Sequence, residues 1–175
     1  MEPIELPLET ERFVIRALRE DDAEAMHEVW SDPRTMLFLP SEPSASLDET
    51  RVRVGRHIER QRELGLSLWA VEQRENGDVV GVCGLFPVGG TGPGVEVAYH
   101  ISRRHWNRGV ATEAARACVA AGLAAGLPEI LAFAFPENAA SLRVMEKIGM
   151  RAHGRVRLYG TELVRYGTAP SGTVV

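Results

Sequence analysis

The sequence has few of the residues that build disulfide frameworks or metal sites. Its two cysteines, Cys83 and Cys118, lie far apart in a chain of 175 residues, and neither forms a Cys-x-x-Cys pair or stands near clustered histidines. Free cysteines are usually buried, whereas paired ones are typical of small secreted domains. We therefore expect two buried thiols in a reducing compartment and no bound metal.

Long apolar runs and a targeting segment are also missing. No stretch reaches the length of about 18 apolar residues that a transmembrane helix needs. The opening residues Met-Glu-Pro-Ile-Glu-Leu have neither a basic start nor an apolar core. The sequence therefore predicts a cytoplasmic protein with no membrane partner.

Basic clusters and common nucleotide-binding loops are absent too. The net charge is −4, with acids and bases mixed along the chain, whereas nucleic-acid binding needs a concentrated basic field. No Gly-x-Gly-x-x-Gly follows a predicted strand, and no Gly-Lys-Ser/Thr loop occurs, which argues against a different nucleotide-binding enzyme. We expect no direct nucleic-acid partner.

What is present suits one compact domain. Apolar residues make up 45% and charged residues 25% of the chain, and no repeat or linker divides it, so we expect a single domain over 1–168 and a flexible tail over 169–175. Apolar periodicity predicts a mixed α/β domain around one sheet, in the order β-α-α-β-β-β-α-β-α-β-β. The predicted strands cover 12–18, 68–72, 79–85, 95–101, 129–135, 151–158 and 162–167, and the predicted helices cover 23–30, 47–64, 110–125 and 138–148.

Two local patterns carry specific predictions. Ser46 and Glu49 form a capping box that opens a helix, and Gly65 ends it. Asn76-Gly77, between two predicted strands, indicates a tight hairpin in which both turn residues take positive φ.

The segment from Glu96 to Thr112 carries the main chemical signal. A predicted strand leads through an arginine-rich bend into a helix that opens on Asn-Arg-Gly-Val-Ala-Thr. Helix N-termini present unpaired N–H groups with a partial positive charge, and small residues such as Gly109 and Ala111 allow a phosphate to approach them. This pattern predicts a pyrophosphate site, although a glycine before a helix is also common in ordinary turns.

Two further helical patterns accompany this site. Eight of the residues from Ala111 to Ala125 are alanine, which would let the helix lie close to a sheet or only reflects high helix propensity. Asn138 and Ser141 share one face of the first turn of the next predicted helix, opposite an apolar stripe. Alone, this pair is an ordinary N-cap.

Together these residues resemble a known family. The segment 105–114, His-Trp-Asn-Arg-Gly-Val-Ala-Thr-Glu-Ala, resembles the acyl-coenzyme A pyrophosphate loop of the GNAT superfamily of N-acetyltransferases. Asn138-x-x-Ser141 with 146–150 resembles the next helix in its ribosomal-protein N-terminal acetyltransferase (RimJ/RimL-like) branch. Segments 8–16 and 96–100 are similar to the branch's opening and central strands, and the resemblance covers residues 6–168 in order.

The resemblance implies the GNAT fold, a mixed and mostly antiparallel sheet with two splayed central strands and helices on both faces. It implies acetyl transfer from acetyl-CoA to a primary amine, either a protein N-terminal α-amine or a small amine, by direct attack and without a metal. Glu96 and Ser141 are then the catalytic candidates. The candidate coenzyme-binding residues are Tyr99, His100, Ile101, Arg103, Arg104, Trp106, Asn107, Arg108, Gly109, Val110, Ala111, Thr112, Asn138, Ser141 and Arg143.

Several alternatives stay open. Glu96, on one strand face with Ala98 and His100, is either the general base or a structural partner of an arginine, and His100 is the second candidate base. Trp106 stands where the superfamily often has Gln or Arg, and Ala98 where the branch more often has Gly. The chain could instead be an inactive acyl-CoA-binding sensor or interaction module. The acceptor is not readable, and the C-terminal strands offer a surface for a homodimer.

Overall fold

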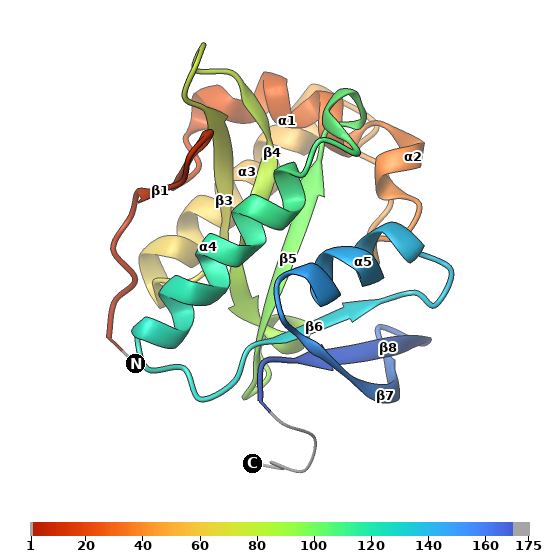
Figure 1. The fold of residues 1–175 in the computed structure, drawn as a ribbon. Coiled ribbons are helices and arrows are strands. Elements are labelled where there is room, and N and C mark those ends of the chain that lie inside the picture. The colour runs from red at the N-terminus through yellow and green to blue at the C-terminus, as the bar shows by residue number, and fades with distance from the viewer. Residues whose placement is uncertain (1, 170–175) are drawn as a thin grey trace.

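One mixed sheet forms the centre of the molecule in the computed structural model, which describes residues 2–169 (Figure 1). Eight strands have the order β1-β2-β3-β4-β5-β6-β8-β7, and every neighbouring pair is antiparallel except β5 and β6. The expected mixed, mostly antiparallel sheet is confirmed. The strands are β1 (Leu8–Glu9), β2 (Phe13–Arg16), β3 (Leu68–Gln73), β4 (Val79–Pro87), β5 (Val95–Ile101), β6 (Leu131–Ala134), β7 (Arg151–Leu158) and β8 (Thr161–Gly167).

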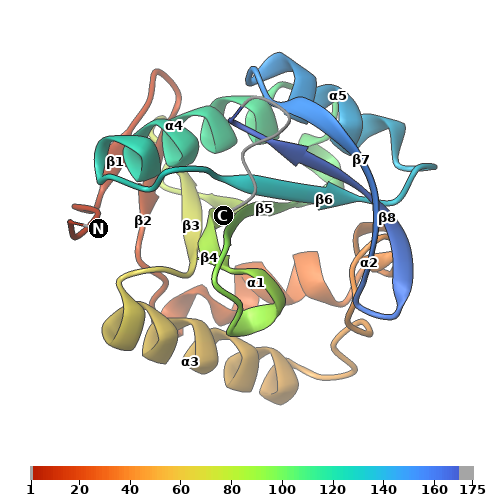
Figure 2. The same cartoon turned by 90° about the horizontal axis from the view of Figure 1, so that it is seen from below.

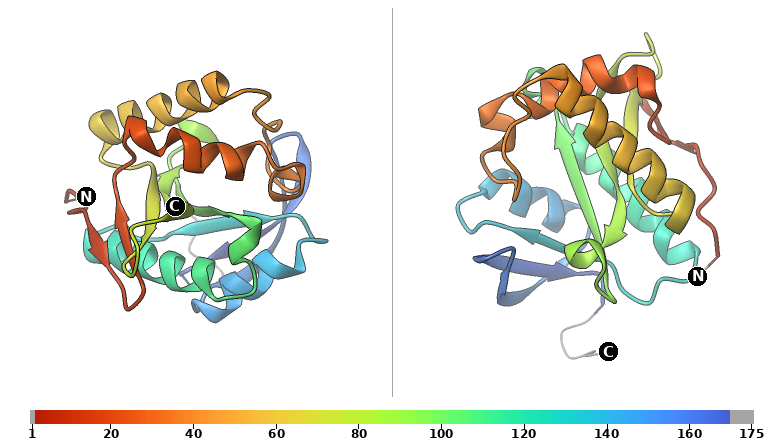
Figure 3. Two further views of the ribbon diagram at one scale, coloured as in Figure 1. Left: turned by 90° about the horizontal axis from the view of Figure 1, so that it is seen from above. Right: turned by 180° about the vertical axis from the view of Figure 1, so that it is seen from behind.

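Helices cover both faces of this sheet, as expected. Helices α1 and α3 lie on one face, and α4 and α5 lie on the other (Figures 2 and 3). The α-helices are α1 (Ala23–Trp30), α2 (Pro33–Met36), α3 (Leu47–Leu64), α4 (Val110–Ala124) and α5 (Ala139–Lys147), and short 3-10 turns occupy Glu20–Asp22, Val88–Gly90 and Arg103–His105.

The two central strands separate after a single point of contact. In the parallel pair β5 and β6, only Glu96 and Leu131 are in register. Beyond Glu96, β5 continues to Ile101 with β4 on one side, and on the other side no strand of residues 2–169 pairs with it. The splay leaves the backbone groups of this β5 edge available to an extended ligand.

Local sequence explains where α3 begins and ends. The Oγ of Ser46 accepts a hydrogen bond from the N–H of Glu49 at 3.2 Å, while the Glu49 carboxylate accepts from the N–H of Ala45 at 2.7 Å. Gly65 ends the helix with φ of 66°, a left-handed conformation that favours glycine. The predicted capping box and C-terminal stop are confirmed, with the returning bond shifted by one residue.

Small residues let α4 lie close to the sheet. Gly122 is buried, and a Cβ added there would stand 2.6 Å from the Leu85 side chain and 2.8 Å from that of Ile130. Ala114, Ala115 and Cys118 are also fully buried on this helix. This close packing places the N-terminus of α4 near the end of β5 that has separated from β6.

The alternation of β5 divides its side chains between two cores. Val97 and Ile101 belong to the core beneath α4 and α5, with Tyr99 packed against it. Ala98 packs against the core beneath α1 and α3, so Glu96 and His100 share that face, as the sequence predicts.

Some local expectations differ from the structure. At the β3–β4 turn only Gly77 takes positive φ, at 77°, while the Asn76 side chain accepts from the N–H of Asp78 at 3.0 Å. The turn is wider than a two-residue hairpin because the N–H of Gln73 bonds to the carbonyl of Asp78. Strand β1 and helix α2 were not predicted as separate elements. The expected tail over 169–175 lies outside the described residues except for Ala169. None of the helices within the described part of the chain has the length and apolarity to cross a bilayer.

Candidate active site

A run of backbone N–H groups at the start of α4 has no protein acceptor. Within residues 2–169, none of the N–H groups from Asn107 to Thr112 donates a hydrogen bond, and the first helical bond is made by the N–H of Glu113. Positive φ values at Asn107 (59°) and Gly109 (75°) shape the chain here. The sequence predicts unpaired amides here, and such amides at a helix N-terminus carry a partial positive charge that favours anions.

This loop is held from behind by the N-terminal segment. Arg12 donates from Nη1 to the carbonyl of Arg108 at 2.9 Å and from Nε to the Glu113 carboxylate at 2.7 Å. The same carboxylate accepts from the N–H of Arg12 at 2.9 Å and from the Thr10 hydroxyl at 2.7 Å. Burial opposes the ionisation of Glu113, but these hydrogen bonds outweigh it and lower its pKa. The contacts fix the loop to the turn between β1 and β2.

A cavity of about 310 Å³ opens beside this helix start. Arg116, in its wall, donates from Nη2 to the Lys147 carbonyl at 2.8 Å and so joins α4 to the end of α5. The wall therefore combines positive side chains with the end of the amide run. Its lining residues are Glu11, Arg12, Gly109, Thr112, Glu113, Arg116 and Lys147.

The three arginines before α4 differ in whether they form an ion pair. Arg103 pairs with Asp32 at 3.1 Å, and Arg104 pairs with Glu28. Arg108 is exposed, with no ion pair to any described residue. Because Arg103 and Arg104 already pair with acids, the backbone amides and Arg108 are the groups at this helix start that have no acceptor or ion-pair partner among the described residues.

Two other predicted residues hold the loop in place, one through a hydrogen bond and one through burial. Trp106 is 40% exposed, and its Nε1 donates to the Ile101 carbonyl at 2.7 Å, which fixes the loop to the end of β5. Val110 is buried in the core beneath α4. Arg143 is exposed on α5, without an ion pair to any described residue.

A hydrogen-bonded group joins β5 to the first turn of α5 at the splay. The hydroxyls of Tyr99 and Ser141 lie 2.8 Å apart, and Tyr99 also donates to the Ser141 carbonyl at 3.2 Å. Asn138 is the N-cap and accepts from the N–H of Ser141 at 3.1 Å. Burial raises the pKa of Tyr99, so the phenol stays protonated and can act as a donor.

Glu96 lies at the closed end of the splay, with its side chain on the opposite face of the sheet from Tyr99. It is only 5% exposed and accepts a hydrogen bond from Tyr159, at the tip of the β7–β8 hairpin. Burial raises the pKa of Glu96 to about 7, although the bond from Tyr159 favours the ionised form. Tyr159 also accepts from the N–H of Gly89 at 3.1 Å. No arginine pairs with Glu96 among the described residues.

His100 lies on the same face as Glu96 but in a different environment. Its Nδ1 accepts a hydrogen bond from the Trp30 indole at 3.0 Å. Burial lowers the pKa of His100 to about 3, with further lowering by the charges of His57 and Arg53. A carboxylate with a pKa near 7 is a far stronger base than this imidazole.

The structure gathers the predicted residues into two connected regions, the amide run with Trp106 and the Tyr99–Ser141–Asn138 group. Glu96 stands apart on the other face. Sequence reasoning missed Tyr159 and the Arg12–Glu113 contact, because partners this far apart in sequence leave no local pattern. The two cysteines are free and buried, as expected, with sulfurs 3.6 Å apart.

Solved acetyltransferases have this fold. The Bacillus anthracis acetyltransferase of the GNAT family superposes with a TM-score of 0.81 at 28% identity, over 93% of this chain and 97% of that one. A ribosomal L7/L12 α-N-protein acetyltransferase in complex with coenzyme A superposes with a TM-score of 0.79 at 16% identity, over 93% and 97% of the two chains. The second similarity shows the fold alone.

The chain belongs to the acetyltransferase (GNAT) domain family, whose family model matches residues 12–151, and is an acetyltransferase enzyme. It is 32% identical over 162 residues to the uncharacterized protein YkkB of Bacillus subtilis, covering 91% of this chain and 93% of that protein. It is 26% identical over 153 residues to the uncharacterized N-acetyltransferase p20 of Bacillus licheniformis, covering 87% and 86% of the two chains.

Proposed function

We propose that this enzyme transfers the acetyl group of acetyl-CoA to a primary amine by direct attack of the amine on the thioester. The observation that carries the proposal is the run of unpaired N–H groups from Asn107 to Thr112, next to the strand edge that β6 leaves free. The family supports acetyl transfer, and this geometry suits a ligand with a diphosphate and an amide-bearing arm. The acceptor is a protein N-terminal α-amine or a small amine.

The coenzyme has a complementary surface on this chain. The amide run would hold its diphosphate, and the exposed guanidinium of Arg108 would add charge beside it. Beyond Glu96, the open edge of β5 would bind the pantetheine arm as an added strand. Asn138 and Arg143, on α5, would line the other side of the arm. No three His, Cys, Asp or Glu side chains within residues 2–169 group as metal ligands.

Glu96 would remove the proton that the attacking amine must lose. A pKa of about 7 leaves a substantial fraction of Glu96 ionised at neutral pH and keeps it basic enough to accept a proton. Its side chain points to the α1–α3 face, so the amine would approach from that side. Tyr159 would orient the carboxylate and limit its contact with water.

Ser141 and Tyr99 would serve the leaving group. As the amine nitrogen bonds to the carbonyl carbon, the carbon–sulfur bond breaks and the thiolate needs a proton. The Ser141 hydroxyl would donate this proton or a hydrogen bond, and Tyr99, 2.8 Å away, would polarise it. Since the pKa of a simple thiol is about 8.5, weak assistance is sufficient. Neither cysteine would form a covalent acetyl-enzyme, because both are buried and not accessible to the thioester.

An acceptor screen tests the proposal. The purified chain is incubated with acetyl-CoA and a panel of N-terminal peptides and small amines, while thiol release and acetylated product are measured. We expect turnover with at least one amine, and loss of turnover in Glu96→Gln and Ser141→Ala at nearly unchanged coenzyme affinity. Coenzyme binding without turnover on the whole panel would instead support a binding module. Absence of coenzyme binding would contradict the site itself.

A further inference from the structure

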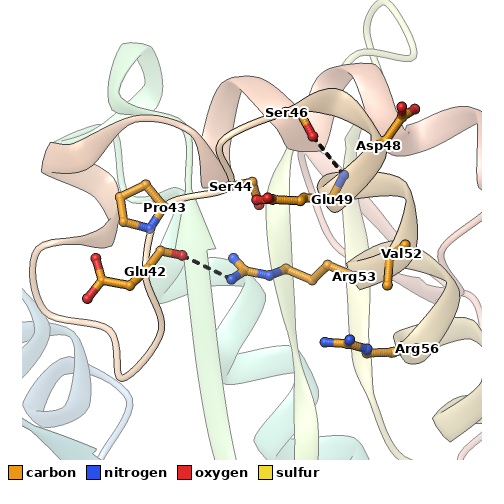
Figure 4. A pocket seen from close by; sticks show the side chains of 9 residues that line it. All are labelled: Glu42, Pro43, Ser44, Ser46, Asp48, Glu49, Val52, Arg53 and Arg56. Carbon is orange, nitrogen blue, oxygen red and sulfur yellow. Dashed lines mark hydrogen bonds between the residues drawn. The ribbon is translucent and has the colours of Figure 1, made fainter.

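A second cavity, of about 490 Å³, lies between the start of α3 and the segment that precedes it (Figure 4). Figure 4 shows the guanidinium groups of Arg53 and Arg56 extending from α3 in the same direction, toward the segment that carries Glu42 and Pro43. The lining residues are Glu42, Pro43, Ser44, Ser46, Asp48, Glu49, Val52, Arg53 and Arg56.

Neither of these two arginines has a carboxylate partner among the described residues. Arg53 and Arg56 form no ion pair, whereas Arg51 and Arg62 on other faces of α3 pair with acids. Arg53 stacks over the Trp30 indole, 5.1 Å from its centroid, and gives one hydrogen bond to the Glu42 carbonyl at 3.1 Å. A guanidinium has five N–H donors, so most of the donors of Arg53 remain available.

The acids that line the cavity form no ion pair with Arg53 or Arg56. Asp48 pairs with Arg51 at 2.9 Å. The Glu49 carboxylate accepts from the N–H of Ala45 at 2.7 Å. The Glu42 carboxylate points away from both guanidinium groups in Figure 4. Burial and the neighbouring charge of Arg56 lower the pKa of Arg53, and the charge of Glu49 opposes this shift without cancelling it.

The cavity and the Glu96 side chain lie on the same side of the sheet, the side covered by α1 and α3. Trp30, beneath Arg53, bonds through its indole N–H to His100 at 3.0 Å. His100 and Glu96 share one face of β5 and are four residues apart, which corresponds to about 13 Å along a strand. The segment after α2 also reaches the splay, since the Phe38 ring lies 5.7 Å from that of Phe135, just after β6.

We propose that Arg53 and Arg56 form an anion subsite for the acceptor, so that the preferred substrate is an amine with a carboxylate or phosphate on the order of 10 Å away. This inference rests on the proposed function, because it assumes that the amine reaches Glu96. Paired guanidinium groups suit both anions, since each can donate two parallel hydrogen bonds. The subsite then selects the acceptor and leaves the coenzyme untouched.

Matched peptides test the subsite. C-terminally amidated peptides with Glu at the second, third or fourth position are compared with the same peptides carrying Gln or phosphoserine there. Calorimetry measures their binding to the chain saturated with coenzyme A, and thiol release measures their acetylation. We expect at least tenfold tighter binding of an anionic peptide than of its Gln counterpart. A stronger effect of phosphoserine than of Glu assigns the site to phosphate, and the reverse assigns it to carboxylate.

Variants on one helix supply the controls. Arg53→Gln and Arg56→Gln should each remove most of the preference for the anionic peptide. Arg62→Gln, on the far side of α3, should keep it. Arg56 makes no stacking contact with Trp30, so its variant separates anion binding from any loss of stability in Arg53→Gln.

The two proposals fail in different ways. Equal binding of Glu, Gln and phosphoserine peptides, or a preference that survives both variants, overturns the subsite whether or not turnover occurs. Anion-selective binding that both variants abolish retains the subsite, and it counts against the proposed acetyl transfer when neither these peptides nor the small amines of the acceptor screen are acetylated.

Discussion

The phenol of Tyr159 donates a hydrogen bond to the carboxyl group of Glu96, so the tip of the last hairpin covers a buried acid at the closed end of the splay. The contact joins residues 63 positions apart in sequence. Burial raises the pKa of Glu96 to about 7 and that of Tyr159 to about 12. The pair therefore consists of a phenol that stays protonated and a carboxyl group that changes state near neutral pH.

The first prediction concerns the pH dependence of acetyl transfer. As a base, Glu96 must be ionised, so kcat/KM should rise with pH up to about 7 and lose this dependence above it. Glu96→Gln should lower kcat by about 100-fold or more and remove this limb of the profile. The measurement compares both proteins with one acceptor, so that titration of the amine affects both equally. An unchanged profile in the variant would assign the base to another group.

The second prediction concerns Tyr159. Its hydrogen bond stabilises the ionised form of Glu96, so Tyr159→Phe should raise the pKa of Glu96 and move the midpoint of the pH–rate profile upward by about one pH unit. Tyr166→Phe is the matched control, because it removes a phenol on the same hairpin that bonds to Glu146 instead. A midpoint that moves equally in both variants would mean that the hairpin acts only through general packing.

The third prediction concerns stability. The pKa of Glu96 is raised on folding from 4.5 to about 7, so its contribution to stability is full below pH 4.5 and is lost as the pH rises through about 7. This loss corresponds to about 3 kcal/mol at most. Glu96→Gln should therefore be more stable than the native chain at pH 8 and nearly equal at pH 4.5, in denaturant unfolding.

Glu113 provides the control of opposite sign. Its pKa is lowered on folding, so its ionised form stabilises the chain above its ordinary pKa and that contribution fades in acid. Glu113→Gln should be less stable than the native chain at pH 8. If both variants shifted stability in the same direction, the two carboxyl environments described above would be wrong.

The fourth prediction concerns the amide run. Gly109 has φ of 75°, and a Cβ there would lie 3.3 Å from Nη2 of Arg12, so Gly109→Ala should cost about 1 kcal/mol of stability and shift the loop. Coenzyme A should bind at least tenfold more weakly in a titration. Gly126→Ala, with φ of 90° and open space around its Cβ position, should lose similar stability and keep its coenzyme affinity. Equal affinity in both variants would remove Gly109 from the coenzyme site.

Much of the fold could be predicted because its signals are local. Ser46 and Gly65 mark the ends of α3, and Asn138 caps α5, each through contacts within one or two turns of chain. The alternation of β5 likewise assigns Val97 and Ala98 to opposite cores. The Asn76 turn differed, because its side chain bonds to Asp78 and so no positive φ is required there.

By itself, the sequence determined the order of the elements, the family, and the glycine-containing helix start that leaves amides unpaired. These features depend on neighbours in the chain, and local spacing reports them directly. Only the tertiary structure decided that Arg103 and Arg104 pair with Asp32 and Glu28, and that Arg53 and Arg56 pair with no acid of the described residues. It also decided that Tyr159 meets Glu96. The strength of a charge or an acid depends on burial and on partners from distant segments, and these are set only when the chain packs.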